Sequence, residues 1–243
     1  MHQILYLYHI NCIMKFIPLL YICAFATSLF GQTKTLETVF AKSDSLYRED
    51  QFYFGITYNR LLNMPVDMAQ NGLSIWVNAG FLRDFPINKS RTVALAAGFG
   101  ISYNKYHQNL LVSAGQGTFN YEIMDDKEYN RNKFEQVTID VPVEIRWRNS
   151  TPESHQFFRV YGGFKFSYLV FDKTKYVGFD FSEKTQFNSD FNKFQYGPYL
   201  SMGYNTWNLY MYYGLNPIFG SGTVENQKIG MNNLNFGLMF YIL

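Results

Sequence analysis

The residues most able to do chemistry in this sequence are few and scattered. Nucleophilic catalysis needs a base beside a nucleophile, and beyond the N-terminal segment the chain has two histidines, His107 and His155. Neither lies in a recognisable arrangement with a serine and an acid. The sequence also contains no HExxH motif, Gly-rich phosphate loop or EF-hand spacing. We therefore expect no catalytic residue, no cofactor and no metal site, and the chain is expected not to be an enzyme.

One acidic stretch could meet a divalent ion. The sequence "MDDKE" (124–128) places adjacent carboxylates in a long expected loop. A solvated loop explains the same residues without a ligand, and we favour that interpretation.

The charged residues with the most regular spacing lie in "VTIDVPVEIRWR" (137–148). In an extended strand successive side chains point to opposite faces. Apolar side chains fall on one face, and that face consists of Val137, Ile139, Val141, Val143, Ile145 and Trp147. The other face is polar and consists of Thr138, Asp140, Pro142, Glu144, Arg146 and Arg148. The question is which medium lies on each side of this strand.

Similar period-two patterns recur along the chain and predict eight strands. Their expected ranges are 51–60, 72–83, 90–104, 134–148, 156–171, 191–205, 206–215 and 232–243. The connections between them alternate between long and short without a break. Outer-membrane barrels have long loops outside, short periplasmic turns and an even strand count. The sequence therefore predicts an all-β fold, an eight-stranded antiparallel up-and-down transmembrane β-barrel with long extracellular loops and short periplasmic turns.

In such a barrel the apolar face of 137–148 meets lipid and the charged face meets the interior. Eight strands leave an interior just wide enough to be filled by side chains, and lone charges buried there cost several kcal/mol each. We therefore expect a paired lumenal charge network rather than an open channel, built from Asp140, Glu144, Arg146 and Lys165. Pro142 and Pro198 fall inside expected strands, where each is expected to mark a bulge or bend.

Composition agrees with a membrane location. The 243 residues suit one domain, and a net charge of +2 without a basic run argues against a nucleic-acid partner. Aromatic residues make up 19% and charged residues only 16% of the chain. This balance is typical of a large apolar surface that faces something other than water, and outer-membrane lipids are the expected surroundings. Tyr58, Trp147, Phe171, Tyr204 and Trp207 lie near expected strand ends, as in interfacial aromatic belts.

The N-terminus resembles a secretory signal peptide. Lys15 precedes the uncharged run "FIPLLYICAFATSLFG" (16–31), and polar residues follow. We expect residues 1–31 to be the signal, with Met14 the true start, 32–50 a polar periplasmic lead-in, and 51–243 the barrel. Both cysteines, Cys12 and Cys23, fall in the signal, so the exported chain is expected to lack thiol chemistry. A retained membrane anchor and a lipid-modified Cys23 are the less favoured alternatives.

Charges gather near the expected short turns. The basic residues are Arg83, Lys89, Arg91, Arg148 and Arg159, against Asp84 and Glu153. A basic rim suits anionic phospholipid heads, and it could equally dock a periplasmic partner. The candidate partner-contact residues are Asp84, Lys89, Arg91, Arg148, Glu153 and Arg159.

Three stretches carry a family resemblance. The segments "DSLYREDQFYFGITYN" (44–59), "FLRDFPINK" (81–89) and "VPVEIRWRNSTPESHQFFRVYGGFKFSY" (141–168) resemble the PorT family, outer-membrane β-barrels of Bacteroidetes linked to the type IX secretion system and gliding motility. The resemblance implies a role in exporting cargo across the outer membrane, with other secretion-system proteins as partners on the periplasmic side or in the membrane. It supplies no catalytic residues.

Three other functions stay open at this point. They are an outer-membrane barrel enzyme, a small adhesin or pore-like barrel unrelated to secretion, and a soluble lipocalin-like barrel. The oligomeric state and the roles of the long loops are also left open by the sequence.

Overall fold

A computed structural model describes residues 50–115, 117–125, 127–149 and 158–242. The expected signal segment, nearly all of the polar lead-in, Glu153 and His155 lie outside the described residues. The eight expected strands are all within them, either wholly or in large part.

None of the described residues forms a helix that is long and apolar enough to cross a membrane.

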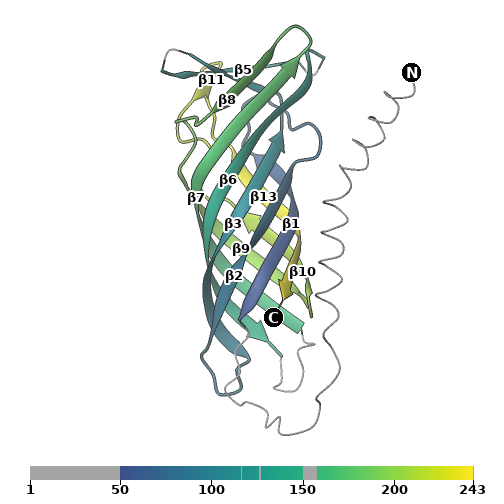
Figure 1. Cartoon of the computed structure of the whole chain (residues 1–243), viewed down its shortest axis with the longest axis vertical. Coiled ribbons are helices and arrows are strands. Elements are labelled where there is room, and N and C mark those ends of the chain that lie inside the picture. The colour runs from purple at the N-terminus through teal and green to yellow at the C-terminus, as the bar shows by residue number, and fades with distance from the viewer. Residues whose placement is uncertain (1–49, 116, 126, 150–157, 243) are drawn as a thin grey trace, which may run out of the picture. The chain divides into compact units, whose positions relative to one another are not determined.

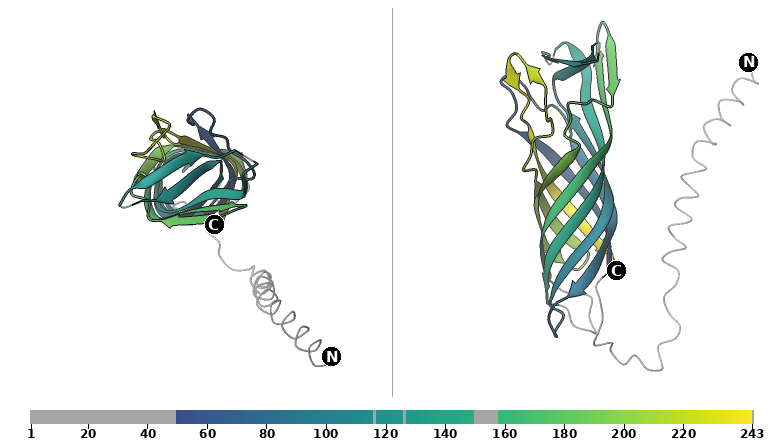
Figure 2. Two further views of the ribbon diagram at one scale, coloured as in Figure 1. Left: turned by 90° about the horizontal axis from the view of Figure 1, so that it is seen from above. Right: turned by 90° about the vertical axis from the view of Figure 1, so that its left-hand side faces the viewer.

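Eight long strands close into an antiparallel barrel (Figures 1 and 2). They are β1 (Gln51–Leu62), β2 (Ile75–Pro86), β3 (Val93–His107), β6 (Tyr129–Arg148), β7 (Phe158–Gly178), β9 (Phe194–Tyr204), β10 (Trp207–Tyr213) and β13 (Asn232–Ile242). Each pairs with the next of these strands along the chain, and β1 pairs with β13. The predicted eight-stranded up-and-down barrel is therefore confirmed.

The connections divide between the two ends of the barrel as predicted. The connections after β2, β6 and β9 are short, and those after β1, β3, β7 and β10 are long. Five short strands, which the sequence patterns did not reveal, lie in the long loops (Figure 1). They are β4 (Leu110–Ala114), β5 (Phe119–Ile123), β8 (Ser182–Gln186), β11 (Thr223–Val224) and β12 (Gln227–Lys228). Here β4 pairs with β5, β11 with β12, and β8 extends the edge of β7.

Two neighbouring strands are much longer than the membrane requires. A spanning strand needs about 9–11 residues, whereas β6 has 20 and β7 has 21. Their upper halves pair with each other beyond the point where β9 and β10 have ended. The barrel wall is therefore taller on this side, which Figure 2 shows at the long-loop end.

The alternation of β6 answers the question that its sequence raised. Ile139 and Ile145 are exposed on the outer surface, whereas Asp140 and Arg146 are buried in the interior. Exposed aromatic side chains gather at the short-turn end of the outer surface, as in the belts of membrane barrels. They are Trp147, Phe158, Tyr204 and Trp207. The apolar outer face is therefore the lipid-facing one.

The middle of the interior is filled by aromatic side chains. Six tyrosines and one tryptophan form most of a buried cluster, and they are Tyr53, Tyr161, Tyr199, Tyr210, Tyr212, Tyr241 and Trp76. Trp76 stacks on Tyr210 with ring centroids 5.4 Å apart. The cavity beside this cluster measures about 10 Å³, which is room for about one water molecule. Side chains therefore block the lumen at mid-height.

The long loops form a second, apolar closure above the barrel, which we call the cap. Its buried side chains include Phe134 and Leu169 from the barrel wall and Phe191 and Phe219 from the loops. Polar contacts join separate loops, since Asp190 accepts hydrogen bonds from the Tyr121 hydroxyl at 2.8 Å and from Ser221 Oγ at 2.6 Å. The cap is therefore one packed unit rather than a set of separate loops.

A bulge or a bend is expected at Pro142 and at Pro198, and the register shows no bulge at either residue. The register shifts lie between Tyr129 and Arg131 and at Val137 to Thr138 on β6, and none lies at Pro142 or Pro198. The register between β3 and β6 is unbroken across Pro142, but the ladder pairs opposite Gly98 and Phe99 are missing. A missing ladder contact thus accommodates the absent N–H without an extra residue.

Candidate functional site

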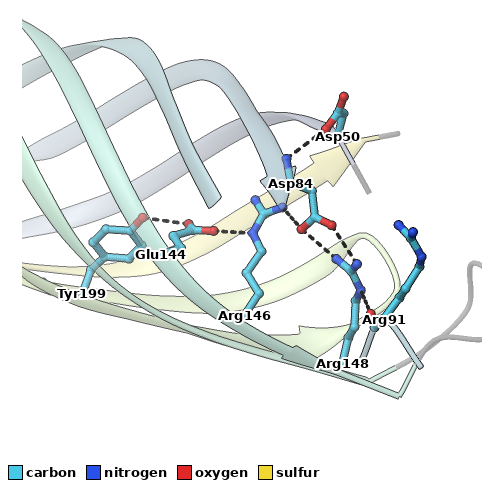
Figure 3. Close-up of polar contacts among 7 residues, drawn as sticks. All are labelled: Asp50, Asp84, Arg91, Glu144, Arg146, Arg148 and Tyr199. Atoms are coloured by element: carbon cyan, nitrogen blue, oxygen red, sulfur yellow. Dashed lines mark hydrogen bonds and ion pairs between the residues drawn. The ribbon is translucent and has the colours of Figure 1, made fainter. Parts of the chain in front are cut away.

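The most distinctive polar site is an ion network inside the short-turn end of the lumen (Figure 3). Asp84 lies near the end of β2 and is fully buried. Its carboxylate accepts a bidentate pair of hydrogen bonds from Arg148, at 2.9 and 2.8 Å, and a third from Arg146 Nη1 at 3.2 Å. One carboxylate therefore holds two guanidinium groups, both fully buried. Bidentate, charge-assisted pairs of this kind are among the strongest hydrogen bonds in proteins.

The network continues upward through Glu144. Arg146 Nε donates to Glu144 Oε2 at 2.7 Å, and the hydroxyl of Tyr199 donates to Glu144 Oε1 at 2.7 Å. Glu144, Arg146 and Arg148 point inward together because they are spaced two residues apart on β6. Tyr199 comes from β9 on another part of the wall. The ion chain therefore links strands that are not neighbours in the sheet.

Gly163 makes room for the tyrosine at the top of this chain. A Cβ at Gly163 would lie 2.4 Å from Cζ of the Tyr199 ring, a distance too short for carbon atoms. The adjacent Gly162 faces outward and has nothing within 4 Å of such a Cβ. The absence of a side chain at Gly163 is therefore what lets the phenol reach Glu144.

The network also reaches the start of the barrel and the turn after β2. Asp50 Oδ1 accepts the backbone N–H of Asp84 at 2.9 Å, and Asp50 Oδ2 lies 3.3 Å from Arg83 Nη1. Arg148 Nε donates to the backbone carbonyl of Arg91 at 3.1 Å. Charged side chains thus fix the chain where it enters β1 and where it turns from β2 into β3.

A second buried pair lies higher in the lumen. Lys165 Nζ is 4.0 Å from Asp140 Oδ2, and its ammonium lies over the Trp76 ring at 4.0 Å and the Tyr212 ring at 4.2 Å. Asp140 also accepts hydrogen bonds from Ser102 and from Thr138. An ammonium over aromatic faces gains cation–π attraction. The lysine is therefore held by one carboxylate and two rings.

The four residues expected in the lumenal network are all buried in the lumen, but they form two groups. Arg146 contacts Glu144, and Lys165 contacts Asp140. The sequence prediction placed Asp84 on the surface, whereas its carboxylate accepts hydrogen bonds from both arginines of the larger group. A signal for its burial was present, because Asp84 has the same parity on β2 as the buried Trp76 and Leu82.

The assignment of partner-contact residues needs correction. Asp84, Arg148 and Arg159 are 0, 0 and 2% exposed, so their side chains are not available on the surface. The strand alternation turns them into the lumen, and Arg159 lies near the Tyr161 and Tyr241 rings at 5.7 and 5.8 Å. Lys89 is exposed and Arg91 is half-buried on the turn after β2, so among the described candidates these two residues remain for a surface contact.

The residues considered for catalysis and metal binding do not converge in the described part of the chain. His107 ends β3 at the long-loop end. Asp125 Oδ1 accepts the backbone N–H of Lys127 at 3.0 Å, and Glu128 Oε2 accepts that of Asp125 at 3.3 Å, so both acids stabilise a turn. No group of three His, Cys, Asp or Glu side chains among the described residues is arranged to hold a metal ion.

A closed antiparallel barrel with an apolar outer band, an aromatic belt and a charged, filled interior defines an outer-membrane β-barrel. A family model described as an outer membrane protein beta-barrel domain matches residues 30–220, and the chain belongs to this family. Among solved structures, Ail, the attachment invasion locus protein of Yersinia pestis, is similar with a TM-score of 0.38 and 13% identity, covering 80% of this chain and 100% of Ail. No curated protein matches the chain. The long-loop end is accordingly the extracellular end and the short-turn end the periplasmic one.

Proposed function

We propose that this barrel is a non-enzymatic component of protein secretion across the outer membrane, an accessory or assembly element of a type IX secretion system that acts through its surfaces. The resemblance to the PorT family supports the secretion role, and the filled lumen supports a role other than that of a conduit.

One structural observation carries the proposal. The three stretches that resemble the PorT family, 44–59, 81–89 and 141–168, are far apart in sequence but supply one site. They contribute Asp50, Asp84, Glu144, Arg146 and Arg148 to the periplasmic ion network. The other two residues drawn in Figure 3, Arg91 and Tyr199, come from outside the three stretches. The three stretches therefore share a structural role, because their charged residues together hold the periplasmic end of the barrel in a fixed arrangement.

A rigid end would present the turn after β2 in a fixed position. Asn88 orders this turn, because its side chain accepts the N–H of Val93 at 3.1 Å and donates to Thr92 Oγ1 at 2.8 Å. Lys89 projects from it into solvent. This turn is the surface on which we would expect a periplasmic partner to bind.

The experiment is deletion of the gene in the host bacterium, with cargo measured in the medium, on the cell surface and in the periplasm. We expect cargo to accumulate in the periplasm of the deletion strain and the wild-type gene to restore its release. Other outer-membrane proteins are measured alongside and should stay normal. Unchanged cargo release in the deletion strain would contradict the proposal and favour an adhesin or a barrel enzyme.

A matched pair of variants tests the turn. Lys89→Glu should lower cargo release while the barrel remains folded in the outer membrane. Lys228→Glu, which reverses an exposed charge at the extracellular end, should leave release unchanged. Equal release with both variants would exclude Lys89 from partner contact.

A further inference from the structure

The outer face of the tall side of the barrel changes from apolar to basic as it leaves the membrane. On β3, β6 and β7 the last apolar rung consists of Tyr103, Val137 and Phe171, which lie directly opposite one another. Below it, Ile101, Ile139 and Tyr168 continue the exposed lipid-facing surface. The pairing register of the strands determines which residues lie above the Tyr103 rung on the same face.

Two rungs follow, and five of their eight side chains are lysines. The first consists of Lys105, Glu135, Lys173 and Gln186 on β3, β6, β7 and β8. The second consists of His107, Lys133, Lys175 and Lys184 on the same four strands. Arg131 lies one step further along β6, opposite Val177. We call the six lysines and arginines of this face the basic patch.

The second rung places like charges opposite one another. Lys133 pairs with Lys175, and Lys175 pairs with Lys184. Directly opposed side chains have Cβ atoms about 4.5–5.5 Å apart, and like charges at that spacing destabilise a sheet. Lys133 contacts Glu135, whereas no described carboxylate lies within ion-pair distance of Lys175 or Lys184. An external anion would remove this repulsion.

Two titratable side chains beside the basic patch, His107 and Glu135, have shifted pKa values. Partial burial is the largest cause of the lowered pKa of the His107 imidazole, and the positive charges of Lys105, Lys133 and Arg131 lower it further. Partial burial raises the pKa of Glu135, but hydrogen bonds from Lys133 and Tyr103 and the charge of Lys173 bring it below its ordinary value. Burial alone already lowers the pKa of His107, so the lowered pKa of Glu135 is the shift that reflects the positive charge.

The first rung lies within the layer of lipid headgroups, and the second rung lies just above that layer. Steps of two residues on strands tilted by about 40° place the two rungs roughly 5 and 10 Å above the Tyr103 rung. The headgroup layer on each side of the hydrocarbon is roughly 5–8 Å thick. Lysine side chains beside a membrane can also direct their ammonium groups into that layer.

We propose that the basic patch binds the phosphate groups of anionic lipids in the outer leaflet, with Lys133, Lys175 and Lys184 as its centre. The length of β6 and β7 and the pairing of β8 with β7 then have a function, which is to build a four-stranded surface at headgroup height (Figure 1). This inference is independent of the secretion role.

The test uses the full chain refolded in uncharged detergent micelles and titrated with diphosphorylated lipid A, with the lipid-bound fraction measured by native mass spectrometry. Lys133→Gln/Lys175→Gln/Lys184→Gln should weaken binding on the order of 100-fold, because each basic residue near an anionic surface contributes about a factor of five. The control Lys127→Gln/Lys193→Gln/Lys228→Gln removes three exposed lysines outside the patch and should change binding by less than about 5-fold.

Two further arms identify the chemistry. Replacing the three central lysines by arginine should preserve binding. Lipid A without its phosphates should bind the wild-type protein weakly, with about the affinity that the glutamine variant has for phosphorylated lipid A. A heat-modifiability gel confirms that each variant is folded, and the glutamine variant should fold because it loses like-charge repulsion.

Three results would overturn the proposal. They are equal affinity of both glutamine triples, equally tight binding of dephosphorylated lipid A, and full displacement of the lipid by millimolar inorganic phosphate. The last result would indicate a site for free anions instead of a lipid site.

Discussion

Removal of one carboxylate should destabilise the periplasmic end of the barrel far more than its size suggests. Asp84 accepts three hydrogen bonds from two fully buried guanidinium groups. Asp84→Asn keeps the volume but leaves both arginines without that negative charge. Removing one partner of a buried ion pair typically costs 3–5 kcal/mol, so we expect the free energy of unfolding to fall by about that amount.

The assay is reversible unfolding in urea from lipid vesicles, followed by tryptophan fluorescence. Trp147 and Trp207 are exposed on the lipid-facing surface, so their emission reports transfer from lipid to water. With a slope of about 2 kcal/mol per molar urea, a loss of about 4 kcal/mol lowers the midpoint by roughly 2 M.

Two comparisons separate the ion network from a general effect of losing a charge. Asp180→Asn alters an exposed loop carboxylate and should change stability by less than about 0.5 kcal/mol. Adding Arg148→Gln to Asp84→Asn should recover about 1–3 kcal/mol, because the buried cation is removed together with the carboxylate that balanced it. The reasoning is refuted if Asp84→Asn unfolds within about 1 kcal/mol of wild type.

Two further predictions concern the packing of the lumen and the cap. Gly163→Ala should destabilise the barrel by about 1–3 kcal/mol, because its Cβ would overlap the Tyr199 ring. Gly162→Ala should leave the stability unchanged, because nothing lies within 4 Å of its Cβ. Equal urea midpoints for the two variants would contradict the packing described. Phe219→Ala should loosen the cap, since the buried Phe219 ring lies 4.4 Å from that of Phe191 and such truncations cost about 3–5 kcal/mol. Limited proteolysis should then cut the long loops while the barrel stays heat-modifiable, and Phe179→Ala, at an exposed loop position, should not increase cutting.

The strands and the lumenal face were predictable because period-two alternation acts through local chain geometry. Ile139 and Asp140 each point to the side that their parity on β6 predicted. The same parity places Arg148 with Arg146 and Arg159 with Lys165, so their burial was also within reach of the sequence. All three of Asp84, Arg148 and Arg159 lie close to turns, but the parity of the strand rather than proximity to a turn determines that they are buried.

Other features depend on contacts between distant segments. The cap joins Tyr121, Asp190 and Ser221 from three loops, and no local pattern indicates which loops meet. The upward extension of β6 and β7 includes polar residues such as Lys133 and Lys175, which weaken the apolar signal on which strand prediction relies. The basic patch likewise becomes visible only when the register places residues of β3, β6, β7 and β8 side by side.

The most direct test of the filled lumen is the conductance of the purified, refolded chain in a planar lipid bilayer. An interior filled by the Tyr53 and Trp76 cluster, with ion pairs below and the cap above, predicts insertion without a steady conductance step at physiological salt. A reproducible, long-lived open channel from heat-modifiable, monodisperse protein would contradict the closed interior, and with it the proposal that this barrel acts through its surfaces.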